Sequence, residues 1–103
     1  MFISIRRYEN AQLPSAIRER VEKEFLPLLT RTPGFMGYHL VDCGNGTIAS
    51  ISMFDSRESA LASNTDAKEW VRQHLPDMLP QPAQIVTGET ILSSVKPPTK
   101  VVL

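Results

Sequence analysis

The amino-acid sequence predicts an α+β domain in which one antiparallel sheet carries its helices on a single face. Four segments are rich in β-branched and aromatic residues, two segments repeat apolar residues at helical spacing, and Asn45-Gly46 is a strong signal for a two-residue hairpin. Along the chain these segments follow the order strand, helix, strand, strand, helix, strand. This βαββαβ order predicts the ferredoxin-like arrangement, an antiparallel four-stranded sheet with helices on one face.

The first strand and the first helix are predicted in the N-terminal third of the chain. Residues 2–8 (FISIRRY) have strand composition, and Pro14 suits the first turn of a helix, where its missing N–H costs nothing. The apolar stripe of this helix has spacings of 4, 4 and 3 and consists of Ile17, Val21, Phe25 and Leu28. Pro27 removes a backbone donor and clashes with the preceding turn, so we expect a kink or an end near Leu26.

A hairpin and a second helix follow. Residues 35–43 and 47–54 are the predicted strands of the hairpin, and Asp55 with Glu58 fits a capping box at the start of the helix. Apolar residues then recur at helical spacing as far as Met78, but the polar stretch 63–66 interrupts them. We therefore expect either two helices or one broken helix in this region.

The chain closes with a predicted strand at residues 84–93 and an extended tail. Because 103 residues fit one domain and not two, residues 1–94 are expected to form a single domain. Residues 95–103 form the tail, which is rich in proline at its start. Its last residues, 101–103, either latch onto a partner or are loose, as chain ends often are.

The hairpin also predicts which side chains share a face of the sheet. With the turn at residues 45–46, Tyr38 lies opposite Met53 and His39 lies opposite Ser52. One face is nearly all apolar and is predicted to pack on the helices; it holds Ile3, Ile5, Met36, Tyr38, Leu40, Ala49, Ile51 and Met53. No third helix is left for the other face, so we predict a closed homodimer in which a second copy of the chain covers it.

Composition and charge exclude several classes of protein. The 11 basic and 11 acidic residues cancel, which argues against a nucleic-acid partner. No apolar run approaches the roughly 20 residues of a membrane span, and the N-terminal arginines follow an apolar run where a signal peptide has them before it, so a cytoplasmic protein is expected. The single cysteine, Cys43, excludes an internal disulfide, and with His39 and His74 it makes no zinc signature, so no metal is expected.

Several motifs resemble those of the antibiotic-biosynthesis-monooxygenase-like domains of the dimeric α+β barrel superfamily. They are residues 32–38 (TPGFMGY), residues 53–60 (MFDSRESA), Trp70-Val71 and residues 87–89 (TGE), within a pattern that spans residues 2–93. The resemblance implies two identical sheets that close into a barrel, with a pocket between helices and sheet in each subunit. It also implies that the chain is similar to proteins that oxidise aromatic substrates with dioxygen and no cofactor, and to others that degrade haem.

Two groups of residues are candidates for the site. In the first, His74 and Trp70 lie one helical turn apart and are the candidate catalytic residues, while Tyr38, Met53 and Asn64 are candidates for binding substrate. In the second, His39, Ser52 and Arg6 form either an anion or polar ligand site or a polar network that fixes the register of the dimer.

The function expected from this resemblance is that of a homodimeric monooxygenase. It would act on a small aromatic or hydrophobic molecule without a cofactor, and without nucleic-acid or membrane partners. One alternative is a non-catalytic module that binds a small molecule or only dimerises. A haem-binding or haem-degrading protein is a further alternative, although haem is not predicted as a cofactor.

Overall fold

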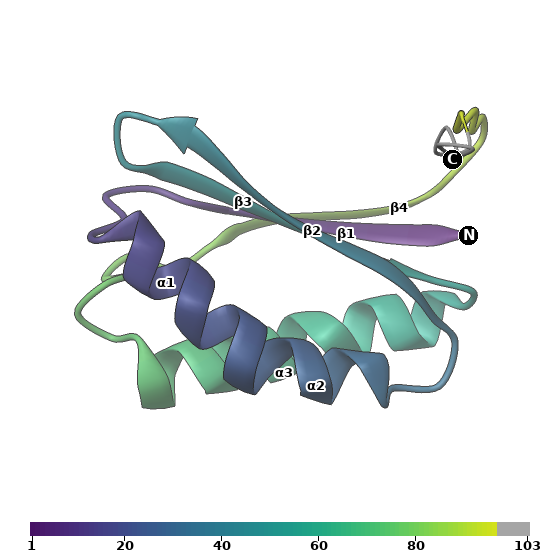
Figure 1. Ribbon diagram of the computed structural model, residues 1–103. Coiled ribbons are helices and arrows are strands. Elements are labelled where there is room, and N and C mark those ends of the chain that lie inside the picture. The colour runs from purple at the N-terminus through teal and green to yellow at the C-terminus, as the bar shows by residue number, and fades with distance from the viewer. Residues whose placement is uncertain (97–103) are drawn as a thin grey trace, which may run out of the picture.

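The computed structural model describes residues 1–96 and has the predicted two-layer architecture, with all helices below one face of the sheet (Figure 1). The sheet has four antiparallel strands in the order β2-β3-β1-β4. The strands are β1 (Phe2–Tyr8), β2 (Phe35–Gly44), β3 (Thr47–Phe54) and β4 (Gln84–Glu89). The ferredoxin-like βαββαβ prediction is therefore confirmed, although β4 ends earlier than expected.

The first helical segment continues past Pro27 by widening a turn. It consists of α1 (Pro14–Arg20), the π-helical turn η1 (Val21–Phe25) and α2 (Leu26–Thr30). A π turn spreads one turn over more residues, which accommodates the proline without ending the helix. Because the turn is wider, the buried stripe continues to Leu29, which is 1% exposed, and the predicted Leu28 is 45% exposed. The helix was predicted to kink or end near Leu26, but it continues there through the π-helical turn, and the stripe was predicted one residue too early.

The second helical segment is one uninterrupted helix, α3 (Arg57–His74). The predicted break at residues 63–66 was wrong, because Ser63 faces the core and its hydroxyl donates a hydrogen bond to the Ala60 carbonyl, 2.6 Å away. The predicted capping residue was also wrong. Ser56 is the N-cap, and its Oγ accepts a hydrogen bond from the Ser59 N–H at 3.2 Å.

The hairpin turn is confirmed, but the register behind it shifts by one residue. Asn45 and Gly46 both have positive φ, 52° and 79°, as a tight two-residue turn requires. A β-bulge between Asp42 and Gly44 then places Tyr38 opposite Ser52, not Met53. The bulge therefore moves one strand of the hairpin relative to the other.

The two faces of the sheet are largely exchanged relative to the prediction. Tyr38 and Leu40 face the helices as expected, but they do so together with polar residues of the central strands: Ser4, Arg6, Ser50 and Ser52. The apolar residues expected there lie on the opposite face, which we call the open face; they are Ile3, Ile5, Ala49, Ile51 and Met53. The assignment failed because it took the more apolar face to be the inner one, whereas hydrogen bonds satisfy the buried polar face.

Among residues 1–96, no helix is long and apolar enough to cross a membrane. Residues 97–103 lie outside the described part of the chain, and so does the predicted contact of the tail end with a partner.

Candidate functional site

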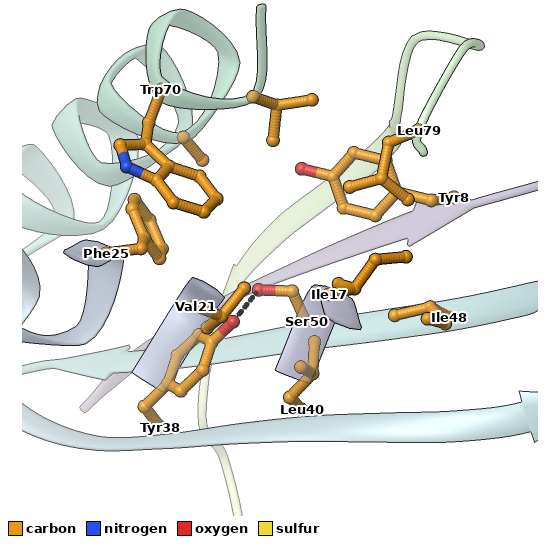
Figure 2. Close-up of a pocket in the computed structure, with 12 residues that line it drawn as sticks. Tyr8, Ile17, Val21, Phe25, Tyr38, Leu40, Ile48, Ser50, Trp70 and Leu79 are labelled. Carbon is orange, nitrogen blue, oxygen red and sulfur yellow. Dashed lines mark hydrogen bonds between the residues drawn. The ribbon is translucent and has the colours of Figure 1, made fainter. Parts of the chain in front are cut away.

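An aromatic cluster fills the space between α3, the first helical segment and the sheet (Figure 2). The Phe25 ring lies 5.3 Å from the Trp70 ring, tilted by 38°, and meets Tyr38 edge-on at 6.2 Å between ring centroids. The Tyr38 hydroxyl is 2.9 Å from Ser50 Oγ. The remaining space, which we call the core cavity, has a volume of only about 20 Å³, room for about one water molecule. This region is packed core.

The residues of the first predicted group are not brought together in one pocket. Tyr38 and Trp70 do line the core cavity. His74 lies outside it, exposed, with its ring 5.4 Å from the Trp70 ring. Met53 belongs to the open face on the other side of the sheet, and Asn64 lines a different cavity. Catalytic roles for His74 and Trp70 remain predictions.

A larger cavity of about 350 Å³, which we call the lateral cavity, lies between α3, the strands β1 and β4, and the loop after α3. Its volume is in the range of small-molecule sites. The strand side contributes Arg6, Tyr8 and Ile85. The helix side contributes Asn64, Lys68, Val71 and Arg72. The loop side includes Leu79 and three prolines, Pro76, Pro80 and Pro82, whose fixed backbone angles make this rim stiff.

Arg6 is the most unusual residue in this wall, because its side chain is only 1% exposed. Its Nη1 donates to Ser63 Oγ at 3.3 Å and to Asn64 Oδ1 at 3.0 Å. Its Nη2 donates to Ser50 Oγ at 3.0 Å and to Ser52 Oγ at 2.5 Å. All four acceptors are neutral, and Nε–H has no hydrogen-bond partner in the described part of the chain.

The electrostatics of this wall follow from burial. No carboxylate among residues 1–96 forms an ion pair with Arg6. Burial lowers the pKa of the Arg6 guanidinium below its ordinary value, and the nearby Tyr8 and Tyr38 act in the opposite direction. Burial raises the pKa of the Tyr8 hydroxyl, which keeps it protonated at neutral pH, while the charge of Arg6 opposes this shift.

Asn64 is held from both ends of its amide. Its Oδ1 accepts from Arg6, and its Nδ2 donates to Thr87 Oγ1 at 3.0 Å. Thr87 Oγ1 is in turn 2.9 Å from Ser4 Oγ, which donates to the Ala60 carbonyl at 3.0 Å. The side chains along the strand wall are therefore fixed in orientation by one continuous network.

The second predicted group is brought together only in part. Arg6 and Ser52 are bonded as neighbours, but they are buried on the helix-facing side of the sheet and not on the open face. His39 is exposed and pairs with Ile51, whose side chain lies on the open face. Sequence reasoning missed Tyr8, Lys68 and Arg72. The spacing of Asn64, Lys68 and Arg72 by four residues each was the available signal, because it places them on one side of a helix.

Within residues 1–96, no group of three or more His, Cys, Asp or Glu side chains is arranged to hold a metal ion. The lateral cavity also has no histidine in its described lining, so it offers haem no histidine ligand.

Comparison with known proteins supports the fold. No protein-family model matches the chain, and no curated protein matches it either. Among solved structures, a protein of unknown function from Nitrosomonas europaea superposes with a TM-score of 0.71 at 17% identity, covering 93% of this chain and 94% of that one. A monooxygenase from the gene ActVA-Orf6 of Streptomyces coelicolor, in complex with nanaomycin D, has a TM-score of 0.67 at 15% identity, with coverages of 93% and 91%.

A third similar structure is a MhuD mutant with two manganese protoporphyrin IX molecules bound per active site. Its TM-score is 0.67 at 18% identity, and the match covers 93% of this chain and 100% of that chain. A further similar structure is described as an antibiotic biosynthesis monooxygenase. The chain therefore has the ferredoxin-like fold of the antibiotic-biosynthesis-monooxygenase-like proteins.

Proposed function

We propose that this chain binds a small aromatic or hydrophobic molecule in the lateral cavity and oxidises it with dioxygen, without a tightly bound cofactor. The observation that carries the proposal is the cavity itself, about 350 Å³ in volume, with a fixed polar network in its strand wall and a stiff proline rim. A stiff, fixed site binds with little ordering cost. The monooxygenase crystallised with nanaomycin D has the same fold, which supports this assignment.

In such a reaction the substrate itself supplies the electrons. The ring CH₂ group of an anthrone takes up one oxygen atom to become C=O, and the second oxygen atom leaves as water with the two hydrogens. A hydroquinone takes up one oxygen atom at a ring C–H to become the hydroxyquinone, and the second oxygen atom again leaves as water. The protein's part is to position the ring and to hold protons. Tyr8 and Asn64 are suited to this, since the first stays protonated at neutral pH and the second is fixed by two hydrogen bonds.

Oxygen uptake against a panel of hydroquinones and anthrones tests the proposal. Ala83 lines the lateral cavity, so Ala83→Phe fills it and is expected to abolish uptake. Ala62→Phe adds the same ring on the exposed side of α3 and is expected to leave uptake unchanged. No uptake by the unaltered chain across the panel would contradict the oxygenase assignment.

A non-catalytic module that binds a small molecule or only dimerises is the second candidate function. It is favoured by the packed core around Trp70, where the predicted catalytic pair does not line an open pocket. Binding of aromatic probes without oxygen uptake would support this alternative. A shift of the absorption band of haem when the chain is added, relative to free haem, would support the haem alternative instead.

We further propose that the open face is covered by a second copy of the chain. Ile5 and Val86 pair on adjacent strands and are 41% and 67% exposed. The described helices all lie on the other side of the sheet (Figure 1). An apolar surface of this kind is unusual on a monomer. Light scattering is expected to give a dimer, and Ile51→Asp on the open face to give a monomer. Leu61→Asp, on exposed α3 surface, is the control that should stay dimeric.

A further inference from the structure

We propose that the ligand of the lateral cavity is an anion, an aromatic ring bearing a carboxylate or an ionised hydroxyl, with its oxyanion directed at Arg6. This inference rests on the proposed small-molecule site and adds the charge of the ligand. It follows from three observations on the described residues: a buried cation without a counter-charge, a positive lining, and a matching division of the cavity into apolar and polar parts.

The first observation is the state of Arg6. A charge taken out of water is costly unless an opposite charge or a full set of hydrogen bonds compensates it. Arg6 is 1% exposed, its four hydrogen-bond acceptors are all neutral, and its Nε–H has no described partner. The guanidinium is therefore hydrogen-bonded by the protein but not neutralised, and an oxyanion in the lateral cavity, whose wall includes Arg6, would supply the missing counter-charge.

The second observation is the charge of the lining. Its charged residues are Arg6, Lys68 and Arg72, and the described lining contains no Asp or Glu. Arg72 pairs with Glu69 at 2.7 Å, but Glu69 is not part of the lining, and Lys68 makes no ion pair within residues 1–96. Clefts lined by one sign of charge concentrate ligands of the other sign.

The third observation is how the cavity is divided. Val71, Leu79 and Ile85 offer apolar surface for a ring, while Arg6 and Asn64 are among the polar residues of the lining. The hydroxyls of Ser50, Ser52 and Ser63 hold the guanidinium in a fixed orientation before any ligand arrives. A positive charge fixed in this way stabilises a nearby negative oxygen without reorganisation.

A purely structural Arg6 is the competing explanation. Its hydrogen bonds join β1 to β3 and to α3, and this role alone would hold the layers together. An arginine with only this structural role would not make ligand affinity depend on ligand charge. The two explanations therefore differ in one measurable quantity, the preference for an anion over a neutral molecule of the same shape.

Titration calorimetry of the full chain with 1-naphthoate and 1-naphthamide measures this preference without any mutation. We expect 1-naphthoate to bind about 10- to 100-fold more tightly, the range of a hydrogen bond to a charged group. Equal or tighter binding of the amide overturns the anion inference while leaving the cavity as a binding site. Failure of both probes to bind overturns the proposed site as well.

Variants then assign the preference to Arg6. Arg6→Gln is expected to remove the preference for the anion. Arg6→Lys keeps the positive charge but loses the planar guanidinium group, so it is expected to reduce the preference. Arg57→Gln removes the same charge from the exposed start of α3 and should leave it unchanged. Circular dichroism checks that Arg6→Gln is folded; if it is not, Arg6→Lys carries the test. A preference that survives in the folded Arg6 variant overturns the inference.

The ionised hydroxyl is tested with 4-nitro-1-naphthol, whose absorbance distinguishes phenol from phenolate. Bound to the unaltered chain it is expected to ionise at lower pH than in free solution, and this shift should shrink in Arg6→Lys. Ionisation at the same or higher pH when bound would overturn the phenolate form of the inference and leave the carboxylate form to the naphthoate result.

Discussion

The core cavity and the lateral cavity lie under the same sheet and against the same helix, yet they differ in almost every physical respect. They share Tyr8, Val71 and Leu79 in their linings. Close-packed aromatic rings leave the core cavity only about 20 Å³, whereas the lateral cavity keeps about 350 Å³ beside a buried cation. The difference teaches that aromatic residues on the apolar stripes build the core here, and that the larger space lies where the proline-rich loop after α3 meets the sheet.

The largest loss of stability, which tests whether the core cavity is packed core, is expected from Trp70→Ala. Trp70 is 6% exposed and packs against Phe25, so its truncation should lower the free energy of unfolding by about 3–5 kcal/mol. His74→Ala removes only an exposed ring and should cost about 0.5 kcal/mol or less. Urea denaturation measures both losses. If Trp70→Ala lowers the free energy of unfolding by less than His74→Ala does, this region is not packed core.

The next largest effect concerns the polar side of the comparison. Ser52→Ala removes an acceptor of the Arg6 guanidinium in a site with no exposed surface, so a loss of about 2 kcal/mol in the free energy of unfolding is expected. Ser15→Ala, at an exposed position of α1, should be neutral. If thermal or urea unfolding shows no difference between these variants, the network around Arg6 does not contribute to stability.

A smaller effect is expected at the start of α3, the helix that both cavities share. Ser56→Ala removes the N-cap acceptor and should cost about 1 kcal/mol in the free energy of unfolding. Asp55→Ala, at the position that sequence reasoning chose as the cap, should cost less. A larger loss for the Asp55 variant in denaturant titrations would restore the predicted capping box.

The smallest effect is a dependence on alkaline pH. Burial raises the pKa of Tyr8 and of Tyr38 above the ordinary value of 10.0. Because the folded state then holds these protons more tightly than the unfolded state, their contribution to stability is complete below pH 10.0 and is lost as pH rises through the folded pKa. Ultraviolet absorbance should show late tyrosine ionisation, and Tyr38→Phe should reduce the alkaline loss of stability. Ionisation of both tyrosines at the ordinary pKa would contradict their burial.

Sequence patterns predicted the strands, the hairpin and the order of elements because these depend on local preferences. Asn45-Gly46 is one example, since its turn needs only the backbone freedom of two residues. The faces of the sheet could not be predicted in the same way. The bulge at Asp42–Gly44 shifts the register, and the burial of Arg6 depends on hydroxyls from β3 and α3 that are far away in the sequence.

The site was predicted least well for a related reason. Trp70 and Tyr38 were chosen as residue types that often bind ligands, and they do lie close together, but Phe25 fills the space between them. The lateral cavity depends on the loop at residues 76–83, whose path over the sheet no periodic pattern describes. Only the four-residue spacing of its helix side could be read from the sequence.

The side-chain amide of Asn64 determines whether Arg6 has a counter-ion within the chain. Its oxygen faces Arg6 and its nitrogen faces Thr87, so exchange of that nitrogen for oxygen, as in Asn64→Asp, changes neither size nor shape. It would nevertheless supply the guanidinium with a counter-ion from within the chain. One atom of one side chain therefore decides whether this wall of the cavity is cationic or already neutralised from inside.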